Sequence, residues 1–364
     1  MHFQPLEKAL ADPEITVVAQ IAPAVRVSLG ELFGYAPGTP LTKKVVGALK
    51  QLGFDFVFDT SLGADVAVVE AGFEFKERLE KGGLFPVINS CCPGTVLFLE
   101  HAYPDLVPHV ASVKSPMEIT AVLAKTYFAQ KKKLDADKIF SVAVMPCVIK
   151  KSEALRREMR VDGRQMVDLV LTTVELAEFM GRKGVDLRSC EEKDFDSLLG
   201  TASGAGQIFG STGGVSEAAI RHFASTQNFK IEKTVVDSLR APDGLRETVF
   251  NVGGKQIKVL VINCLRNASV VLNDKQKFSQ YHFIEIMACL GGCVGGAGQP
   301  TSTLENLEKR RSGLYSIDSA TQLKAPMQSP DVQAVYKEFL GSPASEKSLA
   351  LLHTTFSKIC TDCF

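Results

Sequence analysis

The sequence predicts an α/β fold with two lobes, each a largely parallel, twisted sheet flanked by helices. Apolar stretches of strand type alternate along the chain with amphipathic helical stretches, an order that typically gives parallel sheets. Three short segments that contain cysteines each follow the C-terminal end of a predicted strand. Loops at that end of an open α/β sheet converge on one crevice. We therefore expect a site in the cleft between the lobes.

The predicted strands are short apolar runs of the kind that form buried strands. They lie at 15–21, 54–58, 64–69, 85–89, 139–144, 167–171 and 283–286, with a hairpin over 248–262 around Gly253 and Gly254. The first run ends at Ala22-Pro23, and the runs at 85–89, 139–144 and 283–286 lead directly into the segments with cysteines.

The predicted helices have amphipathic periodicity or recognisable ends. Ser28 is a plausible N-cap for one helix, and Gly53 stops another that covers 42–52. A long helix over 116–131 has Ser115 at its cap and a proline in its first turn. A further helix covers 174–181.

The chain of 364 residues exceeds the usual size of a single hydrophobic core. We expect residues 1–364 to form one unit whose approximate lobes are 1–160 together with 335–364, and 161–334. The charged stretch 153–163, which lacks apolar periodicity, is the expected crossing between the lobes.

Charge and hydropathy exclude several classes of partner. Lys+Arg and Asp+Glu both number 41, so the formal net charge of +0 gives no electrostatic reason to bind nucleic acid or an anionic membrane. No apolar run approaches the roughly 20 residues that span a bilayer, and Met1 to Pro5 lack the pattern of a signal peptide. We expect a cytoplasmic, reducing compartment, where nine cysteines suggest metal or redox chemistry rather than disulfides.

Five of the nine cysteines lie in three short segments that are far apart in the sequence. The segments are NSCCPG at 89–94, MPCVIK at 145–150 and EIMACLGGC at 285–293. Thiolates gathered from distant segments suit a polynuclear iron–sulfur site better than a local zinc site. Cys92, Cys147, Cys289 and Cys293 would complete the ligand set of a 4Fe–4S cluster. Two alternatives stay open: buried, unreactive thiols, and a zinc site, although Cys289 and Cys293 are the one close pair among the four.

These segments resemble the three signatures of the FeFe-hydrogenase catalytic domain, which read TSCCPxW, MPCxxKxxE and ExMACxxGCxxGGGQP. The likeness covers essentially the whole chain. It extends to Ala22–Arg26, Lys114–Pro116, Ser203–Gly206, Phe209–Val215 and Leu352–Thr354.

The resemblance implies an H-cluster, in which a 4Fe–4S cubane is joined to a diiron subsite with CO, cyanide and azadithiolate ligands. Cys92, Cys147 and Cys289 match cubane ligands, and Cys293 matches the thiolate shared with the diiron unit. Lys150 matches the lysine that holds a cyanide ligand, a role that suits a compact ammonium group. The residues implied to line the diiron pocket are Ala22, Pro23, Ala24, Met117, Met145, Phe209, Gly210 and Met287.

The implied activity is the reversible heterolytic cleavage of H2 and the reduction of protons, in an anaerobic setting. The resemblance also implies an external ferredoxin-like electron carrier and maturation proteins that supply the diiron subsite. Two departures from the family pattern lie near the cluster, because Thr95 replaces the usual tryptophan and Met117 replaces a frequent glutamine.

The implied proton relay is incomplete. Cys91 matches the thiol that passes protons to and from the cofactor, and Glu74 matches the outer glutamate. The inner glutamate and the serine between them are replaced by Ala71 and Ala111, so turnover is expected to be slow. Glu70 and Ser112 are one residue away, but in extended segments such a step points to the opposite face. Waters could fill the gap.

Two further functions remain open. A hydrogen sensor would carry the same cluster and turn over slowly, which the interrupted relay favours. A hydrogenase-like iron–sulfur assembly protein would keep the cubane and lack the diiron subsite. Cys360 and Cys363 form a CxxC pair near the end of the chain, interpreted as a reduced thiol pair or, alternatively, as a redox or metal-binding pair.

Overall fold

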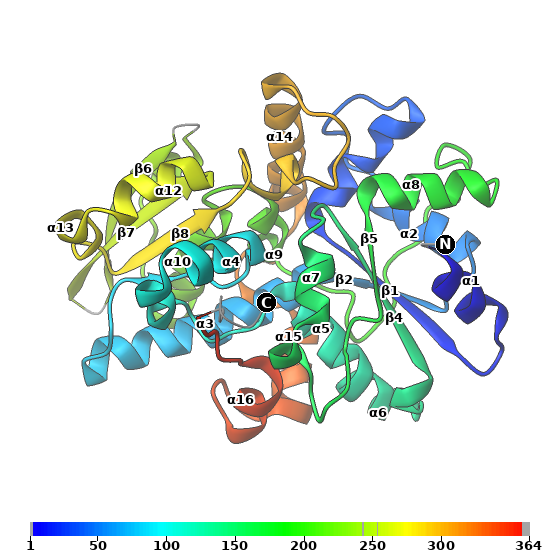
Figure 1. The fold of residues 1–364 in the computed structure, drawn as a ribbon, viewed down its shortest axis with the longest axis horizontal. Coiled ribbons are helices and arrows are strands. Elements are labelled where there is room, and N and C mark those ends of the chain that lie inside the picture. Colours follow the sequence, from blue (N-terminus) through cyan, green and yellow to red (C-terminus); the bar gives the residue numbers. More distant parts are fainter. Residues whose placement is uncertain (1–2, 242–243, 253, 359–364) are drawn as a thin grey trace.

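The structure is a computed structural model that describes residues 3–241, 244–252 and 254–358. Its strands form two four-stranded sheets, which lie on opposite sides of the molecule with α4, α7 and α9 between them in the view of Figure 1. The strands are β1 (Thr16–Ile21), β2 (Phe56–Asp59), β3 (Val87–Ile88), β4 (Ile139–Met145), β5 (Leu169–Thr172), β6 (Leu245–Val252), β7 (Lys255–Asn263) and β8 (Phe283–Met287).

Helices surround and connect the sheets. They are α1 (Gln4–Ala11), α2 (Thr42–Gln51), α3 (Thr60–Lys81), α4 (Pro93–Ala102), α5 (Pro116–Leu123), α6 (Ala129–Lys132), α7 (Lys150–Leu155), α8 (Thr173–Arg182), α9 (Gly204–Gln207), α10 (Gly214–Gln227), α11 (Lys233–Arg240), α12 (Leu265–Leu272), α13 (Lys275–Phe278), α14 (Leu304–Ala320), α15 (Pro330–Val335) and α16 (Glu346–Leu352). A π-helical turn, Ala124–Phe128, joins α5 to α6, so the long helix predicted from residue 116 is present with one irregular turn.

The sheets are largely parallel, which confirms the predicted α/β class. The first sheet has the order β2-β1-β4-β5 with every pair parallel. The second has the order β3-β8-β7-β6, in which the predicted hairpin β6–β7 is the antiparallel pair. Gly253 of that hairpin lies outside the described residues.

Four strands end at the centre of the molecule. In the first sheet β1 leads into Ala22-Pro23, and its neighbour β4 leads into Cys147. In the second sheet β3 leads into Cys91, and its neighbour β8 leads into Cys289. Each sheet therefore has two neighbouring strands whose carboxyl ends lead into the segments with cysteines or into Ala22-Pro23.

Helix α3 corrects one prediction. The apolar run 64–69 was expected to be a strand, but it lies within α3, which begins where the Asp59 side chain accepts a hydrogen bond from the Ser61 backbone. Residues 60–70 are all buried, so this part of the helix shows no amphipathic period. A helix buried on every side cannot be told from a buried strand by periodicity.

The helix expected after Ser28 is instead a pair of 3-10 helices, Pro23–Val27 and Leu29–Phe33. Ser28 stands at the N-cap position of the second one, but its side chain makes no capping hydrogen bond. Its hydroxyl donates to the Ala24 carbonyl at 2.7 Å and lies 2.6 Å from the Gln299 side-chain oxygen. The short, tight turns place Ala22, Pro23 and Ala24 directly past the end of β1.

The division into lobes near residue 160 stays a prediction. Strand β5 pairs with β4 in the first sheet, and β3 pairs with β8 in the second. Each sheet therefore draws strands from both sides of residue 160.

Helices α3 and α5 cross at very short distance. A Cβ placed on Gly63 of α3 would lie 2.3 Å from the carbonyl oxygen of Pro116 at the start of α5. Since backbone cannot yield as a flexible side chain can, only glycine fits at this crossing.

We expect Gly63→Ala to lower the free energy of unfolding by about 1–3 kcal/mol, because overpacking a tight contact forces backbone shifts of that cost. Denaturant titration monitored by circular dichroism measures the change. Gly181→Ala is the matched control: a Cβ on Gly181, an exposed residue of α8, would meet nothing within 4 Å. That variant should be as stable as the wild type or more so. Equal stability of Gly63→Ala and wild type would contradict the packing argument.

Candidate cofactor site

A cavity of about 80 Å³ lies where the four strand ends meet. It collects all four cysteines proposed as ligands, Cys91, and every residue proposed for the diiron pocket. Its lining is Ala22, Pro23, Ala24, Thr60, Ala64, Cys91, Cys92, Pro93, Pro116, Met117, Met145, Pro146, Cys147, Lys150, Phe209, Gly210, Met287, Ala288, Cys289, Gly292, Cys293 and Gly296. We call this the cofactor cavity.

The backbone aims each cysteine into the cofactor cavity in a different way. Cys92 is the N-cap residue of α4, and Cys147 follows β4 after Pro146. Cys289 and Cys293 lie on either side of Gly291 and Gly292, whose φ angles are 79° and 85°. A Cβ on Gly292 would lie 2.7 Å from the backbone nitrogen of Thr212, so the turn between the two thiols requires glycine.

The chemistry of the thiols fits a cationic inorganic group. Burial and the neighbouring thiols raise the pKa of Cys289 to about 11 and that of Cys293 well above its ordinary value. Burial also raises the pKa of Cys147. Thiolates in such a place need positive charge beside them, as the irons of a cluster provide. Among the described residues no three His, Cys, Asp or Glu side chains are close enough to hold one metal ion; the four thiols surround a space instead.

Lys150 supplies a fixed positive charge at the cavity wall. Its ammonium group lies 2.7 Å from the Glu153 carboxylate and 3.3 Å from the Cys91 carbonyl oxygen. Burial alone would lower the pKa of Lys150, but the charge and hydrogen bond of Glu153 leave it raised. The side chain therefore stays cationic and can donate to an anionic ligand in the cavity.

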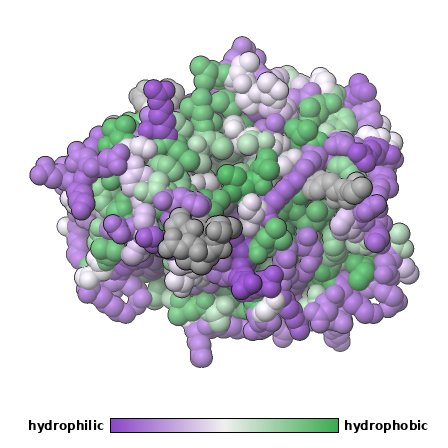
Figure 2. Space-filling model, viewed as in Figure 1, coloured by the Kyte–Doolittle hydropathy of each residue, from purple (hydrophilic) through white to green (hydrophobic). Residues whose placement is uncertain are grey.

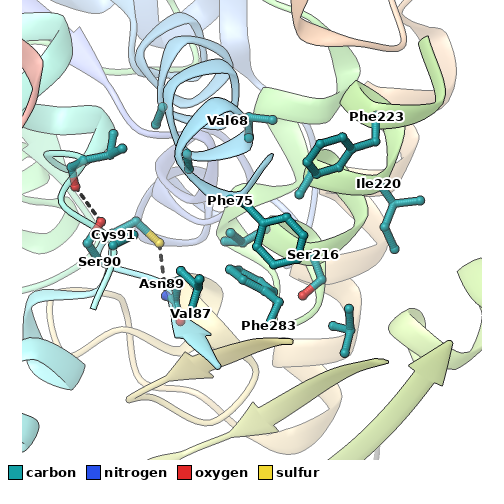
Figure 3. A pocket seen from close by; sticks show the side chains of 18 of the residues that line it. Val68, Phe75, Val87, Asn89, Ser90, Cys91, Ser216, Ile220, Phe223 and Phe283 are labelled. Atoms are coloured by element: carbon teal, nitrogen blue, oxygen red, sulfur yellow. Dashed lines mark hydrogen bonds between the residues drawn. The ribbon is translucent and has the colours of Figure 1, made fainter. Parts of the chain in front are cut away.

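A second cavity of about 70 Å³ shares Cys91 and Phe209 with the first. Figure 3 shows this second cavity. We call it the apolar cavity, because aromatic and aliphatic side chains such as Phe75, Ile220 and Phe283 form most of its wall. Ala71 and Ala111 also line it. The two positions proposed as missing relay stations thus lie beside Cys91, but they present methyl groups.

Cys91 itself is held as a neutral thiol. Burial raises its pKa to about 12, although the Asn89 amide donates to the sulfur at 3.4 Å and opposes that rise. The other polar side chains near it are already engaged. Ser90 donates to the Val113 carbonyl, and Ser216 donates to the Glu285 carboxylate.

Glu74, proposed as the outer relay residue, lines neither cavity. It accepts from the Ser112 hydroxyl at 2.9 Å and pairs with Arg78. The Ser112 hydroxyl is also 2.7 Å from His353 Nδ1, and His353 Nε2 is 3.0 Å from Glu70. A connected chain of polar groups therefore runs from Glu74 to Glu70 behind the wall of the apolar cavity.

The network engages both Glu70 and Ser112 in hydrogen bonds outside the apolar cavity. Tyr336 donates to Glu70 at 2.7 Å, as does the Ala344 backbone at 2.9 Å. Burial would raise the pKa of Glu70, but the hydrogen bonds from His353 and its other donors leave it lowered. Glu70 does not line the apolar cavity, as expected, but the reason expected for this was wrong, because its segment is helical and not extended.

Sequence reasoning missed Glu118 and His353. Glu118 is buried next to Met117 in α5, where one carboxyl oxygen has no hydrogen-bond partner. Its signal in the sequence was a single acidic residue followed by the apolar run ITAVL. His353 was noted only as part of a motif, because its partners are 241 and 283 residues away.

In the part of the chain that the structure describes, no helix is both long and apolar enough to cross a bilayer. Cys360 and Cys363 lie outside the described residues.

The fold and this site together define an α/β protein with a cysteine-lined pocket between two largely parallel sheets. Comparison with known families identifies it further. Residues 15–297 match the model of the iron-only hydrogenase large subunit, C-terminal domain, and residues 304–358 match that of the iron hydrogenase small subunit. The chain belongs to the iron-only hydrogenase family.

Curated relatives include proteins of two kinds. The chain is 41% identical to the NADP-reducing hydrogenase subunit HndD of Solidesulfovibrio fructosivorans over 96% of its own length and 62% of that protein. It is 38% identical to iron hydrogenase 1 of Clostridium pasteurianum over 98% and 64%. It is also 31% identical to cytosolic iron–sulfur assembly component 3 of Mus musculus, over 94% and 74%. The chain thus spans less than two thirds of the first two relatives.

Solved structures agree with the family assignment. The chain matches apo FeFe-hydrogenase HydA1 from Chlamydomonas reinhardtii with a TM-score of 0.84 and 36% identity, over 97% of this chain and 98% of that one. It matches HydA(deltaEFG), the subject of a study of stepwise H-cluster assembly, with a TM-score of 0.84 and 35% identity over the same shares.

Proposed function

We propose that this protein binds an H-cluster and interconverts H2 with protons and electrons at a slow rate. One observation carries the proposal: the four cysteines, Lys150 and all eight residues proposed for the diiron pocket line a single cavity. A cubane alone would need neither the lysine nor the methionines.

The bound cofactor would supply an open iron for hydride and an amine base for the proton. Cys92, Cys147 and Cys289 would hold the cubane, and Cys293 would join it to the diiron subsite. Lys150 would donate to a cyanide ligand, with Glu153 holding its ammonium group in place. Met117, Met145, Met287 and Phe209 exclude water from the pocket, since thioethers and rings fill irregular space without offering strong hydrogen bonds.

Cys91 would give and receive the proton. A thiol whose pKa is raised to about 12 keeps its proton at neutral pH, and its place between the two cavities allows contact with either. The next step outward is obstructed. Ordered water needs two to four polar partners, whereas Ala71, Ala111 and the aromatic wall offer none. We infer that water bridges this gap poorly, so proton supply limits the rate.

Electrons would enter from an external ferredoxin-like carrier. Val148 and Leu290, the residues that follow two of the proposed cubane ligands, are 44% and 48% exposed, so the cubane would lie close to the surface. Figure 2 shows hydrophilic side chains around the rim of one face and apolar patches nearer its centre.

The diiron subsite would come from maturation proteins.

Two related functions each have an observation in their favour. The apolar cavity at the relay positions favours a hydrogen sensor, because a sensor does not need fast turnover. The 31% identity to an iron–sulfur assembly component favours an assembly role with the cubane alone. Lys150 at the wall of the cofactor cavity weighs against the latter.

Infrared spectroscopy of protein loaded with a synthetic diiron cofactor tests the proposal. We expect CO and cyanide bands, because the pocket offers anchoring thiols and a cyanide donor. Lys150→Met should shift or weaken the cyanide bands relative to the wild type. Protein that contains a reconstituted cubane and yet shows no such bands would exclude both the hydrogenase and the sensor.

Replacing the relay thiol should nearly abolish turnover. We expect Cys91→Ala to lower H2 evolution by about 100-fold or more, the usual contribution of a positioned proton donor, while the CO and cyanide bands remain. Cys264→Ala is the matched control, since Cys264 is also a partly exposed free thiol but lines neither cavity. Unchanged turnover in Cys91→Ala would refute the assigned role.

Restoring the relay side chains should raise turnover. The double variant Ala71→Glu/Ala111→Ser places a carboxyl and a hydroxyl beside Cys91, and we expect about a tenfold faster H2 evolution. The control Ala71→Gln/Ala111→Ser has nearly the same volume and cannot transfer a carboxyl proton. If both double variants gain equally, filling of the cavity and not proton transfer is responsible.

A further inference from the structure

Two of the proposed cluster ligands, Cys289 and Cys293, lie on one tight turn. The Gly292 backbone donates to the Cys289 carbonyl at 3.0 Å, and Gly291 and Gly292 both have positive φ angles. Both cysteines line the cofactor cavity, so the position of this turn determines where both sulfurs lie. A metal site tolerates little displacement of its ligands, because metal–ligand distances have to be met within about 0.2 Å.

Two residues from other segments hold the centre of this turn. The Asn263 side-chain oxygen accepts from the Gly291 backbone N–H at 2.9 Å, and the Thr212 backbone N–H donates to the Gly291 carbonyl at 3.3 Å. The Thr212 hydroxyl donates to the same Asn263 oxygen at 3.3 Å. Both polar backbone groups of Gly291 are therefore engaged by one pair of residues that are also bonded to each other.

Asn263 is itself fixed in place. It is the last residue of β7, it pairs with Met287 of β8, and it is 6% exposed. Its backbone N–H donates to the Gly244 carbonyl at 2.8 Å, and its own carbonyl accepts from the Asn267 side chain at 2.6 Å. A side chain whose backbone is anchored on both sides can hold a neighbouring segment to within about 0.5 Å.

The backbone directly after Asn263 is strained. Cys264 has φ 69° and ψ 152°, a conformation that is essentially restricted to glycine. Its backbone N–H donates to the Met287 carbonyl at 2.9 Å. Strain of this kind persists only where the surrounding contacts fix the backbone, and it is commonly found beside functional sites. The strain lies in the backbone and does not involve the Cys264 thiol.

We propose that Asn263 is a positioning residue for the cluster, because its side chain fixes the turn that carries Cys289 and Cys293. It acts through the Gly291 peptide and is neither a ligand nor a catalytic residue. The hydrogen bond to Asn263 also keeps the Gly291 N–H from donating to a cluster sulfur, and such bonds help to set the reduction potential. The inference rests on the proposed function only in that these two cysteines bind a cluster.

The first test uses the full chain without any cluster. Amide hydrogen exchange, followed by NMR of protein labelled with 15N-glycine, reports on the Gly291 N–H. We expect exchange about tenfold faster in Asn263→Ala, the factor that corresponds to one ordinary hydrogen bond. Asn263→Asp should recover the wild-type rate, since a carboxylate oxygen accepts the same bond. Ser329→Ala is the matched control: Ser329 is fully buried and its hydroxyl donates to the Thr201 carbonyl, which does not line the cofactor cavity. Equal exchange in wild type and Asn263→Ala overturns the proposal.

The second test uses protein with a reconstituted cubane and no diiron cofactor. Asn263→Ala should lose iron to a chelator about tenfold faster than the wild type, by the same factor, and the EPR g values of its reduced cluster should differ. Asn263→Asp should recover the retention of iron, and Ser329→Ala should match the wild type in both properties.

The proposal is overturned if Asn263→Ala keeps the wild-type g values or the wild-type rate of iron loss. It is also overturned if Ser329→Ala loses iron as fast as Asn263→Ala, because general destabilisation is then the cause. If the wild type binds no cubane, the proposed function fails, while the first test still decides whether Asn263 holds the turn.

Discussion

The buried helix α3 is the constraint on which the rest of the structure depends, because its acidic residues bind three separate parts of the chain. Asp59 at its N-cap pairs with Arg26, which comes from the turn after β1. Asp65 accepts from the backbone and hydroxyl of Ser203, just before α9. Glu70 accepts from Tyr336, Ala344 and His353 near the end of the chain. Since an unpaired buried carboxylate is costly, these contacts together hold α3 in its place.

This arrangement creates two unlike environments on either side of Cys91. On one side are thiols, Lys150 and glycines that admit a bulky charged group; on the other are rings and methyl groups. The Cys91 sulfur therefore lies between the cofactor cavity, which stabilises charge, and the apolar cavity, which disfavours both charge and water. Binding of a cofactor and fast delivery of protons are separable properties. The residues proposed for the first line one cavity, whereas Ala71 and Ala111 stand at the positions proposed for the second.

Much of the site could be predicted because it depends on local sequence at strand ends. Cys147 and Cys289 each lie within two residues of the end of an apolar run. Because the carboxyl ends of parallel strands converge, this position alone predicted that the two cysteines lie close together. Helix α3 could not be recognised, because burial on all sides removes the periodicity that distinguishes a helix. Glu118 and His353 were missed for a related reason: their importance comes from partners in other segments, and Glu118 matters because one of its oxygens has no partner at all.

The place of Glu70 has a consequence for the order in which the protein assembles during synthesis. Residues that line the cofactor cavity run from Ala22 to Gly296, whereas Tyr336 and His353 bind Glu70 from 266 and 283 residues away. The chain is synthesised from its N-terminus. All residues of the pocket wall are thus synthesised before Tyr336 and His353, so there is an interval during synthesis in which the wall residues are present and Glu70 still lacks these two partners.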